Sequence, residues 1–217
     1  MMGRTHSRTS SGVTALVLAA VLCIALPAGA ELIDRILASV NNDVITLSDL
    51  RQAMAFNSTF SPARENARKL EAETLEGLIN RRLLLQEAYR LRYAEVSDQE
   101  AAAEAAKLKD RLGSEQAFRD FLAATALTEA KLERMLGERL LVERFVEKKI
   151  GLYARVSRDE AQQYYSDHAR EFSGKRFPEV QKQITAFLAG QKTRQQLDQY
   201  LADLHSRSDI RMNPLGE

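Results

Sequence analysis

The sequence has no tryptophan, a single cysteine at Cys23, and only 6% aromatic residues. With one cysteine the chain can form no internal disulfide, so its fold must hold by packing alone, even in an oxidising compartment. Histidine is also rare, and only His168 and His205 follow residue 30. Each lies among charged residues with no second histidine at metal-ligand spacing. We therefore expect both to be exposed to solvent and expect no metal site.

Motifs for catalysis and for cofactor binding are also missing. The glycines are sparse and single, which excludes the glycine-rich loops that bind phosphates or dinucleotides, and there is no Gly-x-Ser-x-Gly nucleophile motif. Carboxylates are plentiful but alternate with basic residues, as in Glu138-Arg139 and Glu143-Arg144, which is typical of solvated helix faces. We expect no catalytic residues and no cofactor, and we interpret the chain as a binding protein.

Neither sign of charge predominates, since 31 lysines and arginines face 30 aspartates and glutamates. This balance argues against nucleic acid as a partner and gives no electrostatic reason to bind anionic lipid.

The first thirty residues have the pattern of a secretory signal peptide. Arg4 and Arg8 precede the apolar run 13–26, and the small residues 28–30 follow it, as at a cleavage site. The run is shorter than the roughly 20 residues that span a bilayer. We expect cleavage after Ala30, no membrane insertion afterwards, and a mature chain of 31–217. An uncleaved N-terminal anchor is the alternative.

Start signals and apolar periodicity predict a mainly α fold. Ser97-Asp98-Gln99-Glu100 and Ser157-Arg158-Asp159-Glu160 are capping boxes, and Ser61-Pro62 and Thr128-Glu129 also begin helices. The predicted helices are 48–57, 62–92, 98–112, 115–125, 129–150, 158–171 and 178–206. The predicted strands are 33–40, 44–46 and 209–212.

Three of these helices carry apolar residues on more than one side. On 62–92, Leu75 and Leu83 lie on one face and Leu84 on the other, and 129–150 has a similar arrangement. Such a helix is either sandwiched between neighbours or leaves one face for a partner, and the pattern allows both. On 178–206 the apolar face rotates beyond Gly190, so this helix should serve two surfaces, with a bend there.

The segment 32–50 stands apart as a hairpin at the start of a helical chain. Two β-branched strands flank the turn Asn41-Asn42-Asp43, and Ser48-Asp49 begins the next helix. This segment resembles the opening of the mature SurA-type periplasmic chaperones, which are often fused to parvulin prolyl isomerases. The stretches 75–88, 96–100 and 127–150 resemble successive helices of that family. The likeness covers most of 32–171 in order.

The chain departs from the family where an isomerase domain would be inserted. In parvulin-bearing relatives a segment like 156–165 leads into that domain, whereas here 177–180 already resembles the closing helix. The resemblance thus implies a chaperone module whose isomerase domain is absent and whose isomerase activity is lost.

The resemblance also implies how the chain is organised. We expect a mainly α, helical chaperone module with a small antiparallel sheet, formed by the N-terminal hairpin and a C-terminal strand at 208–212. A lone hairpin is marginal in water and needs that third strand. The predicted organisation is a signal peptide at 1–30 and one domain at 31–217. That domain comprises a core at 31–171, a linker at 172–177 and a closing helix and strand at 178–217.

By resemblance, the function would be that of an ATP-independent periplasmic holdase that binds unfolded or nascent exported polypeptides, outer-membrane proteins among them. Methionine and aromatic side chains suit such a site because they re-pack around varied clients. The candidate client-binding residues are Met54, Phe56, Phe60, Phe118, Phe121, Met135, Phe145, Tyr153, Tyr164 and Tyr165. For each of them, ordinary core packing is the alternative.

Two other functions stay open. One is a non-catalytic periplasmic scaffold with one dedicated folded partner, either free or kept at the membrane by an uncleaved signal. The other is residual isomerase activity. The oligomeric state, monomer or dimer, is open as well.

Overall fold

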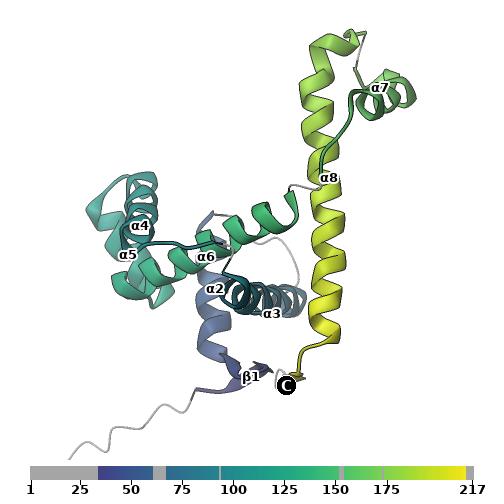
Figure 1. The fold of residues 1–217 in the computed structure, drawn as a ribbon. Coiled ribbons are helices and arrows are strands. Elements are labelled where there is room, and N and C mark those ends of the chain that lie inside the picture. Colours follow the sequence, from purple (N-terminus) through teal and green to yellow (C-terminus); the bar gives the residue numbers. More distant parts are fainter. Residues whose placement is uncertain (1–33, 61–66, 93, 152–153, 173, 214–217) are drawn as a thin grey trace, which may run out of the picture. The chain divides into compact units, whose positions relative to one another are not determined.

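The computed structural model describes residues 34–213 except 61–66, 93, 152–153 and 173. Asp34–Glu217 form a unit of their own by their contacts. The predicted signal peptide, Tyr153 and the expected helix start at Ser61-Pro62 lie outside the described residues. Within the described part, the fold is mainly α, as predicted, with one small sheet (Figure 1). None of the described helices is long and apolar enough to cross a bilayer.

In the described part of the chain, two strands precede the helices and one strand follows them. The helices are α2 (Leu47–Phe60), α3 (Ala67–Leu91), α4 (Asp98–Leu112), α5 (Glu115–Thr125), α6 (Glu129–Lys149), α7 (Arg158–Asp167) and α8 (Phe177–Ser206), with a 3-10 turn η2 (Ala169–Phe172). The strands are β1 (Ile36–Val40), β2 (Asp43–Thr46) and β3 (Ile210–Met212).

The sheet joins the two ends of the described chain. β1 pairs with β2 across a turn in which Asn41 adopts φ 54°, a left-handed conformation that asparagine tolerates. β3 pairs antiparallel with the other side of β1, with Ile210 opposite Val40. Backbone hydrogen bonds of 2.8 Å from Asn41 N to Asp209 O and from Asn213 N to Leu37 O flank this pairing. The predicted completion of the hairpin by a C-terminal strand is confirmed.

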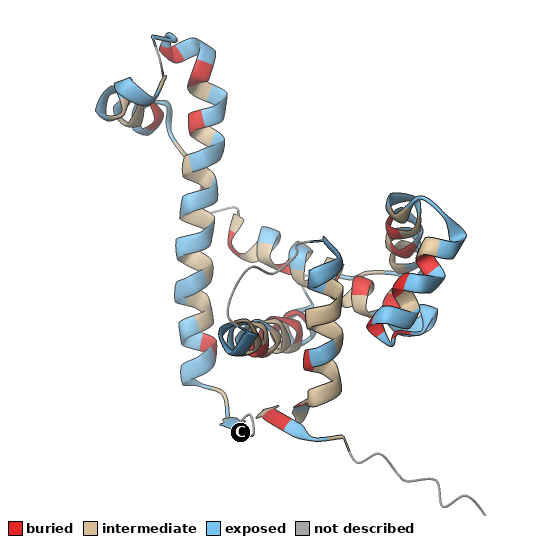
Figure 2. Ribbon diagram, turned by 180° about the vertical axis from the view of Figure 1, so that it is seen from behind, coloured by how far each residue is buried: buried red, intermediate tan, exposed pale blue. Residues whose placement is uncertain are grey.

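α3 is buried on several sides, which explains its two apolar faces. Leu83, Leu84 and Leu85 are all at most 6% exposed, although successive residues point about 100° apart. They share one core cluster with Leu37 of β1 and Phe145 of α6. Of the two possibilities that the sequence leaves open for this helix, the structure shows the sandwiched one, and Figure 2 shows its buried residues among the surrounding elements.

α6 divides its apolar residues between two clusters. Leu141 and Phe145 belong to the cluster around α3, whereas Leu132 and Leu136 pack with α4 and α5. α4 approaches α6 closely, because a Cβ placed on Gly137 would lie 3.0 Å from the Cβ of Ala101. A glycine at this position therefore allows the contact between the two helices.

α8 serves two surfaces, as its rotating apolar face predicts. Its first half contributes Val180 and Ile184 to a cluster with α7, and Leu204 near its end belongs to the cluster around α3. The helix is continuous through Gly190.

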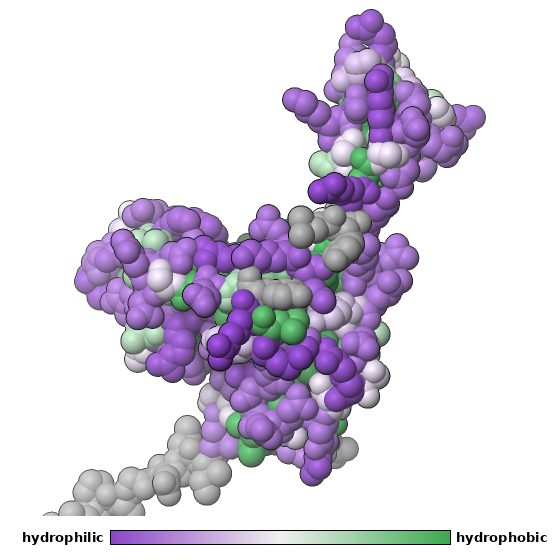
Figure 3. Space-filling model, in the orientation of Figure 1, coloured by the Kyte–Doolittle hydropathy of each residue, from purple (hydrophilic) through white to green (hydrophobic). Residues whose placement is uncertain are grey.

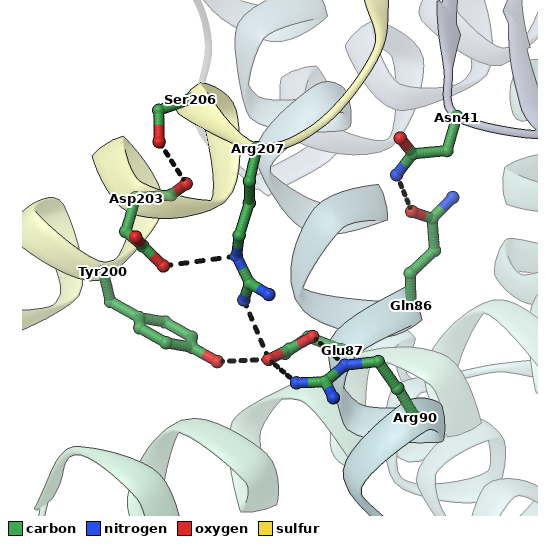
Figure 4. A network of polar contacts seen from close by, with 8 residues as sticks. All are labelled: Asn41, Gln86, Glu87, Arg90, Tyr200, Asp203, Ser206 and Arg207. Atoms are coloured by element: carbon green, nitrogen blue, oxygen red, sulfur yellow. Dashed lines mark hydrogen bonds and ion pairs between the residues drawn. The ribbon is translucent and has the colours of Figure 1, made fainter.

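A buried carboxylate fastens the end of α8 to α3 (Figure 4). Glu87 of α3 is 6% exposed and accepts hydrogen bonds from Arg90 (2.7 and 2.8 Å), the Tyr200 hydroxyl (2.9 Å) and Arg207 (3.0 Å). The hydrogen bond from Arg90 is the largest cause that lowers the pKa of Glu87 to about 2, and Arg207 and Tyr200 add to it. Burial and the bond to Glu87 raise the pKa of Tyr200 to about 12. The contact therefore depends on an ionised Glu87.

The capping boxes are confirmed, whereas the helix predicted over 48–57 extends to Phe60 and the one predicted over 158–171 ends early. The Ser97–Glu100 and Ser157–Glu160 pairs both make reciprocal hydrogen bonds. The helix predicted over 158–171 instead ends at Asp167 and continues as the 3-10 turn η2. The physical reason lies at His168, whose backbone N–H and ring Nδ1 both bond the carbonyl of Tyr164, at 3.0 and 2.9 Å. Beyond His168 the backbone bonds tighten to the 3-10 pattern, as from the N–H of Glu171 to the carbonyl of His168 at 2.9 Å.

Candidate binding groove

A groove of about 400 Å³ lies among α2, α3 and α6, beside β2. Its volume is within the range of roughly 300–1,000 Å³ that is usual for ligand sites. Its apolar lining comes from all four elements and consists of Ile45, Ala53, Phe56, Leu78, Leu85, Met135 and Leu136. Hydrophobic attraction is non-directional, so the apolar lining alone would bind any apolar side chain. Selectivity among ligands must therefore come from the polar lining.

The charged lining of the groove is mainly positive. Its cations are Arg81, Arg82, Lys131, Arg134 and Arg139, and its carboxylates are Asp49 and Glu138. The whole chain has a formal net charge of only +1 at pH 7. The groove therefore concentrates positive charge on a nearly neutral protein.

One end of the groove is held by polar contacts between α2 and α6. The Gln52 amide donates to the carbonyl of Ala126 (3.1 Å) and accepts from the Lys131 ammonium (2.7 Å). Lys131 also lies 3.9 Å from Asp49. Asp49 is itself fixed, because it accepts hydrogen bonds of 3.0 Å from both the N–H and the hydroxyl of Thr46, the last residue of β2. These contacts set the spacing of the two helices.

The facing wall is held by Arg81 of α3. Its guanidinium donates to the carbonyl of Met135 on α6 (2.5 Å) and lies 3.9 Å from Glu138. Burial lowers the pKa of Arg81, and the charge of Glu138 opposes this change. Through these contacts with Met135 and Glu138, Arg81 joins α3 to α6 along the groove.

Phe56 of the groove lining belongs to a cluster of three phenylalanine rings, with Phe60 and Phe121. The ring centroids of Phe56 and Phe121 are 5.6 Å apart, and Phe60 lies within 5.5 Å of Phe56 and 6.2 Å of Phe121. Phe60 is 40% exposed, whereas Phe121 is buried. Aromatic groups at such separations attract one another. The cluster thus offers aromatic surface at one side of the groove.

A second hollow of about 620 Å³ lies on the α4 side of α6. It is lined by α3, by the start of α4 and by Gly137 and Leu141 of α6. Tyr89 borders it and is 60% exposed. The two hollows share Arg134 and Glu138, so these two residues lie where the hollows adjoin.

The predicted client-binding residues fall into several places. Phe56 and Met135 line the groove, and Phe60 and Phe121 adjoin it through Phe56. Phe118 and Phe145 are 2% and 0% exposed and lie in the core, and Met54 is partly buried against the cluster around α3.

The tyrosines are separate from this groove. Tyr164 and Tyr165 are half-buried and pack between α7, η2 and α8, where Phe187 is 48% exposed. Tyr153 lies outside the described residues. The structure therefore brings together four of the ten candidates, all on α2, α5 and α6.

The two histidines differ from each other. His205 is exposed, as expected, and its Nε2 lies 2.6 Å from the side-chain oxygen of Asn80. The expected exposure of His168 is wrong: it is half-buried, because its ring stacks on Tyr164 at 4.0 Å. Among the described residues there is no group of three or more His, Cys, Asp or Glu side chains that could hold a metal ion.

Sequence reasoning missed the polar residues of the groove, Arg134, Arg81 and Gln52 above all. One signal was present, because Arg81-Arg82 interrupts the apolar stretch from Leu75 to Leu85. A charge inside an apolar face is expensive unless it is paired, so such a residue marks either a contact or a site. The sequence gives no comparable indication for Arg134.

The described part of the chain is mainly α and is closed by a small sheet, and comparison with known proteins places the chain in a family. The SurA-like N-terminal domain family matches residues 1–146. The chain therefore belongs to the SurA-like N-terminal domain family, which supports a role as a periplasmic chaperone.

A solved structure shows the same fold. It comes from work on PEB4, a virulence factor, and the periplasmic protein Cj1289, two structurally related SurA-like chaperones of Campylobacter jejuni. The likeness covers 83% of this chain and 99% of that chain, with 14% identity and a TM-score of 0.53. A search of the curated proteins finds no significant match.

Proposed function

We propose that this protein is a periplasmic, ATP-independent holdase chaperone that binds unfolded segments of exported proteins in the groove among α2, α3 and α6. The observation that carries the proposal is the groove itself, which combines the side chains of Met135 and Phe56 with a rim of long charged side chains. Methionine and long side chains adapt to varied ligands, which suits low discrimination. Membership of a chaperone family supports the same function.

The size of the groove favours an unfolded segment over a folded partner. A stable interface between folded proteins buries about 800 Å² on each side. Figure 3 shows apolar surface on the visible face in small patches among hydrophilic side chains, not as one broad face. A hollow of about 400 Å³ accommodates a few side chains of an extended chain. The dedicated scaffold remains the alternative that the experiment below distinguishes.

The proposed periplasmic location rests on the signal-like residues 1–30 and on the family. The proposed loss of isomerase activity, and of any enzymatic role, rests on the short connection between α7 and α8. Only the nine residues 168–176 separate Asp167, the last residue of α7, from Phe177, the first of α8, which leaves no room for an isomerase domain there. We also propose that 31–217 act as one chaperone module, because α8 and β3 complete the core around α3.

Suppression of aggregation tests the function directly. An unfolded outer-membrane β-barrel protein is diluted from denaturant, and light scattering is followed with and without a near-stoichiometric amount of chaperone. We expect scattering to fall without ATP. Scattering unchanged by the chaperone would refute the holdase, and crosslinking that recovers one folded partner instead would favour the scaffold.

A matched pair of substitutions ties the activity to the groove. Met135→Gln removes apolar surface from the groove, and Met212→Gln makes the same change on β3, where Met212 is 63% exposed and outside the groove. Met135 is already half-buried, so a client covers only the rest of it. We expect Met135→Gln to weaken client binding by about 1 kcal/mol, roughly fivefold in Kd. Equal affinities of the two variants would place the client elsewhere, provided that circular dichroism shows both to be folded.

A further inference from the structure

The cations that line the groove differ in whether they already have partners. Lys131 is bonded to Gln52, Arg81 to the carbonyl of Met135, and Arg139 to Glu143 at 2.8 Å. Arg82 lies 3.8 Å from Asp43. A client group could bind one of these four only by competing with the existing contact, and some of those contacts hold the groove together.

Arg134 is different. Its side chain is exposed and has no hydrogen-bond or ion-pair partner among the residues that the structure describes. Glu138, one helical turn further along α6, lies 3.9 Å from Arg81. Arg134 is therefore the groove cation that a client carboxylate can bind without breaking an existing contact, because the new ion pair displaces only water.

The position of Arg134 makes this charge useful to a bound chain. Arg134 lines both hollows, so an extended segment that passes from one to the other passes this residue. Met135, the next residue on α6, offers apolar surface in the groove, with Leu78 of α3 and Phe56 of α2. An apolar side chain in the groove would thus bring its neighbours in sequence close to Arg134.

We propose that the groove selects client segments in which an acidic side chain neighbours an apolar one, and that Arg134 binds the carboxylate. This inference rests on the proposed function and names the class of segment that the groove prefers. Guanidinium and carboxylate match in geometry, with two parallel hydrogen bonds that an ammonium cannot form. Charge complementarity contributes specificity even where it adds little affinity.

The test uses three short, unstructured, fluorescein-labelled peptides with the same Leu-Phe centre, flanked by aspartate, by asparagine or by lysine. Their Kd values are measured by fluorescence anisotropy with the full-length protein. We expect the aspartate peptide to bind about three- to fivefold more tightly than the asparagine peptide, and the lysine peptide to bind most weakly, as for a largely exposed ion pair. The preference should decrease as salt is added.

Substitutions then assign the preference to one side chain. Arg134→Gln should remove the difference between the aspartate and asparagine peptides, and Arg134→Lys should retain part of it. Arg194→Gln is the matched control, because Arg194 is exposed on α8 and outside the groove. It should leave the preference unchanged. Since Arg134 is exposed, these variants are expected to fold normally.

The outcomes separate this inference from the proposed function. Equal affinities of the wild-type protein for the aspartate and asparagine peptides would overturn the inference alone, as would a preference that survives in Arg134→Gln. If no peptide binds at all, the proposed function fails and this inference fails with it.

Discussion

Replacing Glu87 by glutamine removes the charge at the contact between α3 and the end of α8. Glutamine keeps the shape of the side chain but leaves Arg90, Arg207 and the Tyr200 hydroxyl without their carboxylate. The pKa of Glu87 is lowered from 4.5 to about 2. At about 1.4 kcal/mol for each pKa unit, this depression corresponds to about 3 kcal/mol of stability.

The expected effect is smaller than this value. Arg90 and Arg207 are 59% and 44% exposed, so water screens part of their interaction with the carboxylate. We therefore expect Glu87→Gln to lower the free energy of unfolding by about 2 kcal/mol at neutral pH. For a chain of this length, the corresponding fall in Tm is roughly 4–8 °C.

The stabilisation that Glu87 provides should depend on pH in a definite direction. Because folding depresses this pKa, the stabilisation is fully present above the ordinary value of 4.5 and is lost as the pH falls toward about 2. The difference in stability between wild type and Glu87→Gln should thus be constant above about pH 5.5 and shrink below pH 4.5. Urea unfolding at a series of pH values, followed by circular dichroism, measures it.

Glu76→Gln is the matched control on the same helix, since Glu76 is exposed and has no partner among the described residues. Its stability should stay within about 0.5 kcal/mol of wild type. A Glu87→Gln variant that is as stable as this control, or a loss that does not change with pH, would refute the role of the ionised carboxylate.

Two further predictions concern the packing of α4 on α6. Gly137→Val should destabilise the protein by about 1–3 kcal/mol, because a Cβ at Gly137 already lies 3.0 Å from the Cβ of Ala101. As a control, Gly77→Ala on α3 should stabilise the protein by up to about 1 kcal/mol, because the added Cβ has no neighbour within 4 Å. Thermal melting of both variants checks this, and a stable Gly137→Val protein would contradict the close approach. The hydrogen bond from Arg144 is the largest cause that lowers the pKa of Glu100 to about 2, so Arg144→Gln should raise that pKa toward 4.5. NMR titration of the Glu100 carboxyl measures it, and an unchanged value would show that Ser97 alone holds the carboxylate.

The elements that sequence reasoning located best are those whose signals are local. Ser97 and Glu100 form their capping box within four residues, so the start of α4 follows from the sequence alone. The closure of the hairpin by β3 is not local, and it was expected through the likeness to a family rather than from the alternation of 208–212. The end of α7 was missed because it depends on the contacts of His168 with the carbonyl and the ring of Tyr164, which a capping pattern does not encode.

The groove could be predicted only in part, for a different physical reason. Methionine and phenylalanine were the right residue types for Met135 and Phe56, but the same criterion also selected Phe145, which is fully buried. Which face of α2, α3 and α6 stays uncovered is a result of tertiary packing and leaves no periodic trace in any one helix. Arg139 and Arg144 of α6 have partners, whereas Arg134 has none among the described residues, and this difference is a property of the fold.

Photo-crosslinking tests the central claim, that the groove among α2, α3 and α6 binds unfolded clients, most directly. A photoreactive phenylalanine analogue replaces Asn57, which is exposed and lines the groove, or Arg194 as the control on α8. Each protein is irradiated with an unfolded outer-membrane β-barrel protein under conditions in which aggregation is suppressed. We predict a crosslinked product from position 57 and little or none from position 194. Suppressed aggregation with no crosslink from position 57, or with equal crosslinks from both positions, would contradict the account.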